Sequence, residues 1–308
     1  MSSDVKPQFG KESDGDGRFV RQESRFRDVV EERPEAGRYH LYVSLACPWA
    51  SRIVIVRQLK GLADLLPMTV VDPVRDERGW RFDPDRPDPV NGFTFLKEAY
   101  ELSAPGFDDR VTVPVLFDTR ENRIVNNESA DLVRMLNGWS STGPDLYPDD
   151  LRVAIDEVNE RVYNNVNNGV YRAGFATSQA AYEEAFDDLF ATLDWLDDRL
   201  ATNRYLLGDE ITEADWRLFV TLVRFDPVYV GHFKCNLRRI ADYEHLSGYL
   251  RDLYQHPGIA DTVDFDHIKR HYYLTHPQIN PTRIVPKGPE LDLWAPHDRE
   301  RLARRDAA

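Results

Sequence analysis

One cysteine lies where a chain could make a reactive thiolate. Cys47 falls between a strand-like alternation over 39–45 and a helix-like apolar spacing over 48–60. Pro48 suits the first position of a helix, because the N–H that proline lacks would have no partner there. Cys47 is therefore expected to be the N-cap. The free amides of the first turn and the positive end of the helix dipole would then stabilise its thiolate.

The residue three positions after Cys47 is Ala50, so no local disulfide can form. The predicted chemistry is monothiol: a mixed disulfide forms on Cys47 and an outside thiol resolves it. A thiolate at the strand-to-helix turn of a βαβ pattern is typical of thioredoxin-like proteins. The alternative is that Cys47 is a buried, inert hydrophobe, as most free cysteines are. We favour that interpretation for Cys235. The sequence leaves a disulfide between the two open, although intracellular redox conditions argue against it.

The composition limits the partners and the compartment. The chain has 308 residues and a formal net charge of −14, which argues against binding nucleic acid. It has no apolar leader and no run of 18 apolar residues, so we expect neither secretion nor a membrane span. With only two cysteines, the expected location is the cytoplasm. The acidic excess suits a high-salt cytoplasm or an acidic mesophilic protein, and the sequence leaves both open.

The periodicity predicts an α/β thioredoxin-like N-terminal domain followed by an all-α C-terminal domain. The pattern predicts a strand over 39–45, a helix over 48–60 and a strand over 68–72. A long excursion over 73–110 follows, and then two strands over 112–117 and 124–125 and a helix over 129–136. After 150 the apolar spacing is helical throughout. The predicted organisation is an N-terminal arm over 1–36 and a thiol-binding domain over 37–140. A helical substrate domain over 150–290 and a charged tail over 291–308 follow.

Two local signals refine this plan. A proline in a central strand costs a ladder hydrogen bond, and a cis peptide before Pro114 would remove that conflict and turn the Val113 backbone toward Cys47. Thr212 and Asp215 have the spacing of a capping box, flanked by the apolar pair of a hydrophobic staple, Ile211 and Trp216. They predict a buried helix over 213–225 at the centre of the helical domain.

The chain resembles the glutathione transferase superfamily, and within it the glutathionyl-hydroquinone reductases, or Xi class. The resemblance spans nearly the whole chain except its two ends. It is carried by Phe19-Val20-Arg21, Ser24 to Arg27, Ala46-Cys47-Pro48-Trp49-Ala50, Gly79-Trp80, Arg110 to Leu116, Asn126-Asn127-Glu128-Ser129, Asn167-Asn168-Gly169-Val170-Tyr171, Arg224 to Asn236, Ile268 to Tyr273 and Ile279 to Pro289.

The resemblance implies a role for each matching residue. Cys47 would be the nucleophile, and Val113 would pair backbone to backbone with the cysteinyl part of glutathione. Glu128 and Ser129 would bind the γ-glutamyl end, since a helix N-terminus suits a carboxylate. The alternative for this pair is a simple helix cap. Two further residues would flank the rest of the peptide: Trp80 and Arg110.

In the helical half, Tyr171, Tyr229 and Tyr272 match the family's tyrosines around the aromatic substrate. Their hydroxyls could hydrogen-bond a hydroquinone oxygen while the rings enclose it. Whether Tyr272 or Tyr273 faces the substrate is open. The alternative for Trp80 and these tyrosines is that they are ordinary aromatic residues of the core or the surface with no part in binding. His267 and a histidine four residues later have metal-ligand spacing, but nothing completes a site, so we expect no metal.

The resemblance implies that a glutathionyl-hydroquinone is reduced through a mixed disulfide on Cys47, with no tightly bound cofactor. The co-substrate would be glutathione or γ-glutamylcysteine, and for the latter Arg110 would have no role. The physiological quinone is open, and a homodimer is implied. Two alternatives remain: a general thiol transferase or deglutathionylase using the same thiol, and a non-enzymatic, transferase-like interaction module.

Overall fold

The computed structural model describes residues 13–303, so the ends of the predicted arm and tail, 1–12 and 304–308, lie outside the described residues. The chain divides into two compact units. Within the described residues, unit 1 comprises 22–143 and 262–285, and unit 2 comprises 13–21, 144–261 and 286–303. The units are sets of residues that pack together, and the domain limits expected from the sequence stay predictions.

Unit 1 contains the four-stranded sheet of a thioredoxin-like fold, as expected. Its strands are β1 (Tyr39–Val43), β2 (Met68–Val70), β3 (Val115–Asp118) and β4 (Arg123–Asn126). The strand order is β2-β1-β3-β4. β1 pairs parallel with β2 and antiparallel with β3, which pairs antiparallel with β4. Every residue of β1 and β3 is buried, because helices cover the sheet.

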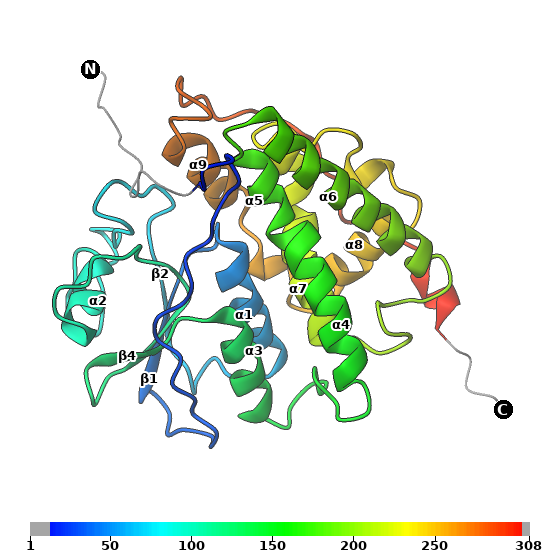
Figure 1. Cartoon of the computed structure of the whole chain (residues 1–308). Helices are drawn as coiled ribbons and strands as arrows, with labels where there is room; N and C mark the ends of the chain where they lie inside the picture. The colour runs from blue at the N-terminus through cyan, green and yellow to red at the C-terminus, as the bar shows by residue number, and fades with distance from the viewer. Residues whose placement is uncertain (1–12, 304–308) are drawn as a thin grey trace. The chain divides into compact units, whose positions relative to one another are not determined.

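Four α-helices complete unit 1: α1 (Pro48–Leu59), α2 (Lys97–Ser103), α3 (Ser129–Gly138) and α9 (Phe265–Thr275). Figure 1 shows α1 and α3 together on one side of the sheet and α2 on the other. Helices α1 and α3 and the four strands confirm the elements predicted from periodicity, with ends that differ by a few residues.

Helix α9 packs in unit 1 although it follows the helical segments in sequence. The His271 ring Nδ1 lies 2.7 Å from the Pro73 carbonyl oxygen, just after β2. The His267 ring Nε2 lies 3.3 Å from Ser44 Oγ, just after β1. The sequence spacing alone had placed this helix with the helical substrate domain.

Among the described residues of unit 2, the regular elements are all helices, as predicted. Its α-helices are α4 (Arg152–Val162), α5 (Gly169–Gly174), α6 (Gln179–Leu200), α7 (Glu213–Arg224) and α8 (Leu246–Gln255). Two π-helical turns, η1 (Tyr163–Asn167) and η2 (Phe225–Tyr229), interrupt the α-helical pattern. Short 3₁₀ turns are η3 (Ile240–Asp242), η4 (Ala260–Thr262), which straddles the two units, and η5 (Arg299–Leu302).

The predicted capping box starts α7. The Thr212 amide donates to Asp215 Oδ2 at 2.8 Å, and the helix ends at Arg224, one residue before the predicted end. The Asp215 carboxylate also accepts from the Leu206 amide at 2.9 Å and the Tyr249 hydroxyl at 2.8 Å. Burial raises the pKa of Asp215, and these hydrogen bonds oppose the rise. All of α7 is buried, which confirms the predicted central helix.

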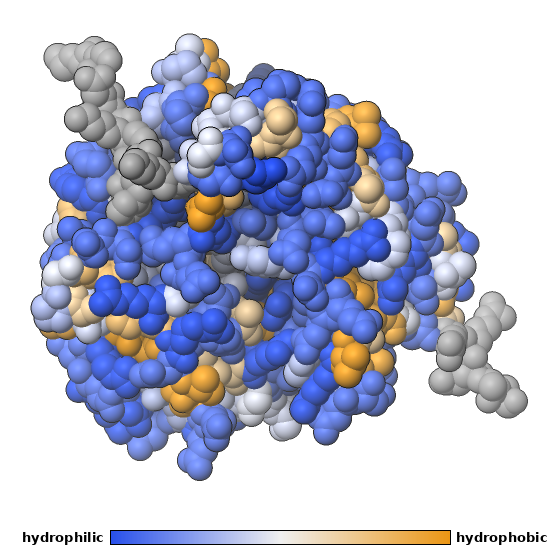
Figure 2. All heavy atoms as spheres, viewed as in Figure 1, coloured by the Kyte–Doolittle hydropathy of each residue, from blue (hydrophilic) through white to orange (hydrophobic). Residues whose placement is uncertain are grey.

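The described part of the predicted arm is divided between the units: residues 13–21 belong to unit 2 and residues 22–36 to unit 1. Its residues 22–36 lie along unit 1, where the Asp28 amide donates to the Val125 carbonyl at 3.1 Å. The face drawn in Figure 2 is dominated by hydrophilic residues, with small separate apolar patches. Among the described residues, no helix combines the length and apolar character needed to cross a membrane.

Candidate active-site residues

Cys47 is the N-cap of α1, with Pro48 at the first helical position, which confirms the predicted local structure. Its amide donates to the Ser44 carbonyl at 3.1 Å, and its carbonyl accepts from the Ser51 amide at 3.0 Å, so the turn is held on both sides. The Cys47 side chain is half-buried and is not in a disulfide.

The Cys47 thiol donates to the Val113 carbonyl oxygen, 3.5 Å from Sγ, and makes no capping hydrogen bond to the first turn of α1. The sequence had placed the sulfur against the helix amides. A protonated thiol is a donor and takes the carbonyl, whereas a thiolate can only accept. The peptide bond between Val113 and Pro114 is cis, as the strand argument anticipated, and the carbonyl ahead of it is the one that faces the sulfur.

A polar contact from α9 supports the turn that carries Cys47. Ser44 is buried, and its Oγ accepts from the Ala46 amide at 3.3 Å while it contacts His267 Nε2 at 3.3 Å. Sequence reasoning missed this contact, because nothing local links a histidine near the end of the chain to a serine before the first helix.

The start of α3 combines a cap with polar side chains that converge from the arm and from α1. Glu128 is the N-cap: Oε1 accepts from the Ala130 amide at 3.0 Å, and Oε2 accepts from Ser24 Oγ at 2.9 Å. Ser129 is buried, and its Oγ accepts from an Arg52 guanidinium N–H at 3.3 Å. Glu128 therefore caps α3, as the alternative interpretation expects. The role of Glu128 and Ser129 in binding the γ-glutamyl group stays a prediction.

Trp80 and Tyr272 both lie against His271 in unit 1. The Trp80 ring is buried and stacks on the His271 ring, with centroids 4.9 Å apart and planes at 23°. The Arg75 guanidinium lies 5.6 Å from the Trp80 ring centre. Tyr272 is also buried and meets the His271 ring edge-on at 5.3 Å. Tyr273, beside it, is more exposed than Tyr272.

Arg110 is held by the arm. Its amide donates to Gln22 Oε1 at 2.9 Å, and its carbonyl accepts from Gln22 Nε2 at 3.3 Å. This side-chain pairing positions the segment just before Val113.

Tyr171 and Tyr229 lie in one aromatic cluster of unit 2, with ring centres 6.1 Å apart. Phe233 stacks on Tyr229 at 5.5 Å and 11°, and meets Tyr171 edge-on at 5.4 Å. Tyr229 is buried on the π-helical turn η2, whereas Tyr171, on α5, is partly exposed. Phe19, from the arm, stacks on Tyr171 at 6.4 Å. The structure thus brings together the first two predicted tyrosines in unit 2 and places the third in unit 1.

Cys235 is fully buried, and burial raises the pKa of its thiol well above the usual range. This agrees with the structural interpretation of this cysteine. Among residues 13–303, no three histidine, cysteine, aspartate or glutamate side chains gather as a metal site would require.

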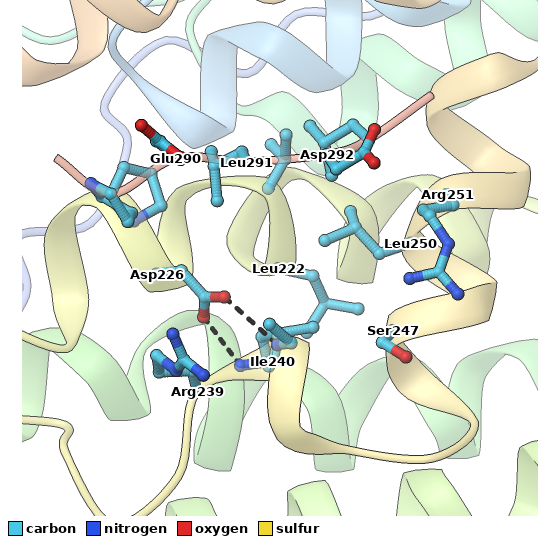
Figure 3. Close-up of a pocket in the computed structure, with 15 residues that line it drawn as sticks. Leu222, Asp226, Arg239, Ile240, Ser247, Leu250, Arg251, Glu290, Leu291 and Asp292 are labelled. Carbon is cyan, nitrogen blue, oxygen red and sulfur yellow. Dashed lines mark hydrogen bonds between the residues drawn. The ribbon is translucent and has the colours of Figure 1, made fainter. Parts of the chain in front are cut away.

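A cavity of about 80 Å³ in unit 2 contains none of the predicted site residues (Figure 3). The Asp226 carboxylate at its edge accepts from the Ile240 amide at 2.7 Å and the Ala241 amide at 3.1 Å, drawn as dashed lines. Burial raises the pKa of Asp226. Leu222 and Leu250 line the cavity together with charged side chains such as Arg251 and Glu290. The two amide hydrogen bonds give the Asp226 carboxylate a structural task, which is to hold η3.

Comparison with known proteins identifies the family. Residues 46–138 match the model "Glutathione S-transferase, N-terminal domain", and residues 179–252 match "Glutathione S-transferase, C-terminal domain". The chain is 51% identical over 286 residues to glutathionyl-hydroquinone reductase PcpF of Sphingobium chlorophenolicum, covering 90% of this chain and 91% of that protein. It is 49% identical over 304 residues to glutathionyl-hydroquinone reductase YqjG of Escherichia coli, covering 92% and 93%.

Solved structures agree. The glutathione-bound structure of YqjG from E. coli superposes with a TM-score of 0.84 at 51% identity, covering 86% of this chain and 89% of that one. The Xi-class glutathione transferase of Natrialba magadii gives a TM-score of 0.87 at 50% identity, covering 90% and 89%. The chain therefore belongs to the glutathionyl-hydroquinone reductases, the Xi class of the glutathione transferase superfamily.

Proposed function

We propose that this protein removes glutathione from glutathionyl-hydroquinones and releases hydroquinone and oxidised glutathione. The observation that carries the proposal is Cys47 at the N-cap of α1, half-buried, with the Val113 carbonyl 3.5 Å from its sulfur. The relatives named glutathionyl-hydroquinone reductases, at 51% and 49% identity over nine-tenths of the chain, support the same substrate class.

In the first step the Cys47 thiolate attacks the thioether sulfur of the conjugate. A Cys47–glutathione disulfide forms as the sulfur–carbon bond breaks, and the electron pair of that bond leaves with the aromatic group. The ring carbon takes a proton, which gives free hydroquinone. Tyrosine hydroxyls that hydrogen-bond the ring oxygens stabilise the negative charge developing there.

In the second step the thiolate of a second glutathione attacks the mixed disulfide. Its sulfur bonds to the sulfur of the bound glutathione, and the Cys47 thiolate leaves, so the products are oxidised glutathione and the starting enzyme. The two electrons that reduce the aromatic carbon come from the two thiols. Because Ala50 stands at the position of a resolving cysteine, the resolving thiol comes from solution.

The contacts described above suit the individual roles that we assign. The Val113 carbonyl that accepts from Cys47 would accept from the cysteinyl amide of glutathione once the thiol has ionised. The start of α3, with Glu128 and Ser129, would hold the γ-glutamyl group. Trp80 and Arg110 would flank the remaining peptide. If γ-glutamylcysteine is the cellular thiol, only the Arg110 contact would be lost.

Three tyrosines, Tyr171, Tyr229 and Tyr272, would surround the aromatic group. The family resemblance implies a homodimer, which sedimentation at several concentrations tests. The low cysteine count favours action in the cytoplasm. No tightly bound cofactor is needed, because thiol exchange supplies both electrons.

The decisive experiment compares wild type, Cys47→Ala and Cys235→Ala on a glutathionyl-menadiol conjugate, with glutathione and γ-glutamylcysteine as alternative thiols. Wild type and Cys235→Ala should release menadiol, and Cys47→Ala should not. Mass spectrometry after one turnover without resolving thiol should find one glutathione on Cys47. Turnover by Cys47→Ala at the wild-type rate would refute the mechanism. Exchange on a simple disulfide without release of menadiol would instead favour a general thiol transferase.

A further inference from the structure

Arg21 lies on the face of the Tyr171 ring. Its guanidinium carbon is 4.7 Å from the ring centre. Arg21 Nε donates to Asn168 Oδ1 at 2.8 Å, and the Asn168 carbonyl accepts from the Tyr171 amide at 3.0 Å. Asn168 therefore contacts both residues. Its side chain holds the Arg21 guanidinium, and its carbonyl holds Tyr171 in the first turn of α5.

The segment that carries Arg21, residues 13–21, is anchored on unit 2. The Gly17 carbonyl accepts from the Thr177 amide at 3.0 Å, and the Asp16 carbonyl accepts from Ser178 Oγ at 2.8 Å. Gly17 has φ +86°, and a Cβ there would lie 2.9 Å from the Ser178 amide nitrogen, so only glycine fits this approach. The position of Arg21 is consequently built into the fold.

We propose that Arg21 is a positioning residue for reduction of the conjugate and acts through Tyr171. This inference rests on the proposed function. Arg21 itself forms no bond to the substrate in this scheme and transfers no proton. When the sulfur–carbon bond breaks, negative charge reaches a ring oxygen of the hydroquinone, and the Tyr171 hydroxyl hydrogen-bonds that oxygen. A cation on the ring face stabilises the negative charge that the phenol shares.

The size of the effect follows from the geometry. A guanidinium within about 6 Å of a ring centre is attracted to it more strongly when both are partly desolvated, as both are here. Removing the guanidinium should therefore slow reduction of the conjugate roughly tenfold. The effect is expected in kcat rather than in KM, because the charge develops in the transition state.

The test compares Arg21→Met, which keeps the side-chain length and loses the charge, with Arg21→Lys, which keeps the charge. Arg21→Met should lower kcat for a glutathionyl-menadiol conjugate about tenfold, and Arg21→Lys should recover most of it. The matched control is Arg25→Met, because the Arg25 guanidinium also lies over a ring, that of Phe107 at 5.6 Å in unit 1. The control should stay within about twofold of wild type.

Two further measurements separate this inference from the proposed function. In a Tyr171→Phe background, Arg21→Met should have no additional effect on kcat, since the cation acts through the hydroxyl. An equal tenfold loss in both backgrounds would overturn the inference while reduction of the conjugate stood. The alkaline absorbance titration of tyrosinate, wild type minus Tyr171→Phe, needs no turnover at all. Arg21→Met should move the Tyr171 transition to higher pH, and an unmoved transition would overturn the inference even if the conjugate proved not to be a substrate.

Discussion

The buried histidine next to the aromatic cluster should make unit 2 sensitive to acid. His232 is 4% exposed, and its ring lies 5.3 Å from Phe233, which packs on Tyr171 and Tyr229. Burial and, to a smaller extent, the neighbouring Lys234 charge together lower the pKa of His232 from 6.5 to about 4. Protonation therefore has to place a charge in a site that does not solvate it.

The sign and magnitude follow from linkage. The unfolded chain binds a proton at this histidine near pH 6.5 and the folded chain only near pH 4, so unfolding takes up a proton in between. The stability that the neutral ring contributes is complete above about pH 6.5 and is lost as the pH falls toward 4. A shift of about 2.5 pKa units corresponds to about 3 kcal/mol.

Urea unfolding between pH 7 and pH 4 measures this loss, with hydrogen exchange of α7 reporting on unit 2. His232→Gln provides the comparison, because glutamine stays neutral over the whole range. Burial also lowers the pKa of His40 and His256, so both proteins should lose stability toward acid and wild type should lose about 3 kcal/mol more. Parallel pH profiles for wild type and His232→Gln would refute the reasoning.

Three more substitutions test packing and a buried hydrogen bond in units 1 and 2. Gly174→Ala would place a Cβ 2.2 Å from the Phe233 ring and should destabilise unit 2 by about 1–3 kcal/mol in thermal unfolding. Gly138→Ala, whose Cβ would meet nothing within 4 Å, should instead stabilise unit 1 by about 0.5–1 kcal/mol in the same measurement. Tyr249→Phe removes a hydrogen bond to the buried Asp215 carboxylate and should lower the free energy of unfolding by about 1.5–3 kcal/mol; a loss under 0.5 kcal/mol in urea titration would contradict the assigned contact.

Local sequence signals correctly predicted the helix starts that depend only on neighbouring residues. Pro48 after Cys47 marked the start of α1, and the spacing of Thr212 and Asp215 marked the start of α7. Each signal is a contact between residues within one turn, so the sequence holds all the information that the contact requires.

Contacts between distant segments could not be predicted. Nothing near Tyr171 shows that Arg21, 150 residues earlier in the chain, lies on its ring, because a cation over a ring leaves no periodic pattern. The π-helical turns η1 and η2 were not predicted either, because each has only five residues, too few to show a period of its own. The direction of the Cys47 thiol depends on whether it carries a proton, which residue types alone do not decide.

The packing of α9 in unit 1 sets the order in which this protein can mature during synthesis. The sheet is encoded between residues 39 and 126, yet the ring that stacks on Trp80 and the side chain that contacts Ser44 come from residues 271 and 267. While a ribosome is still translating the helical unit, the turn that bears Cys47 lacks the contact between Ser44 and His267. A nascent chain released before α9 would carry the Cys47 thiol in a unit that lacks one of its helices.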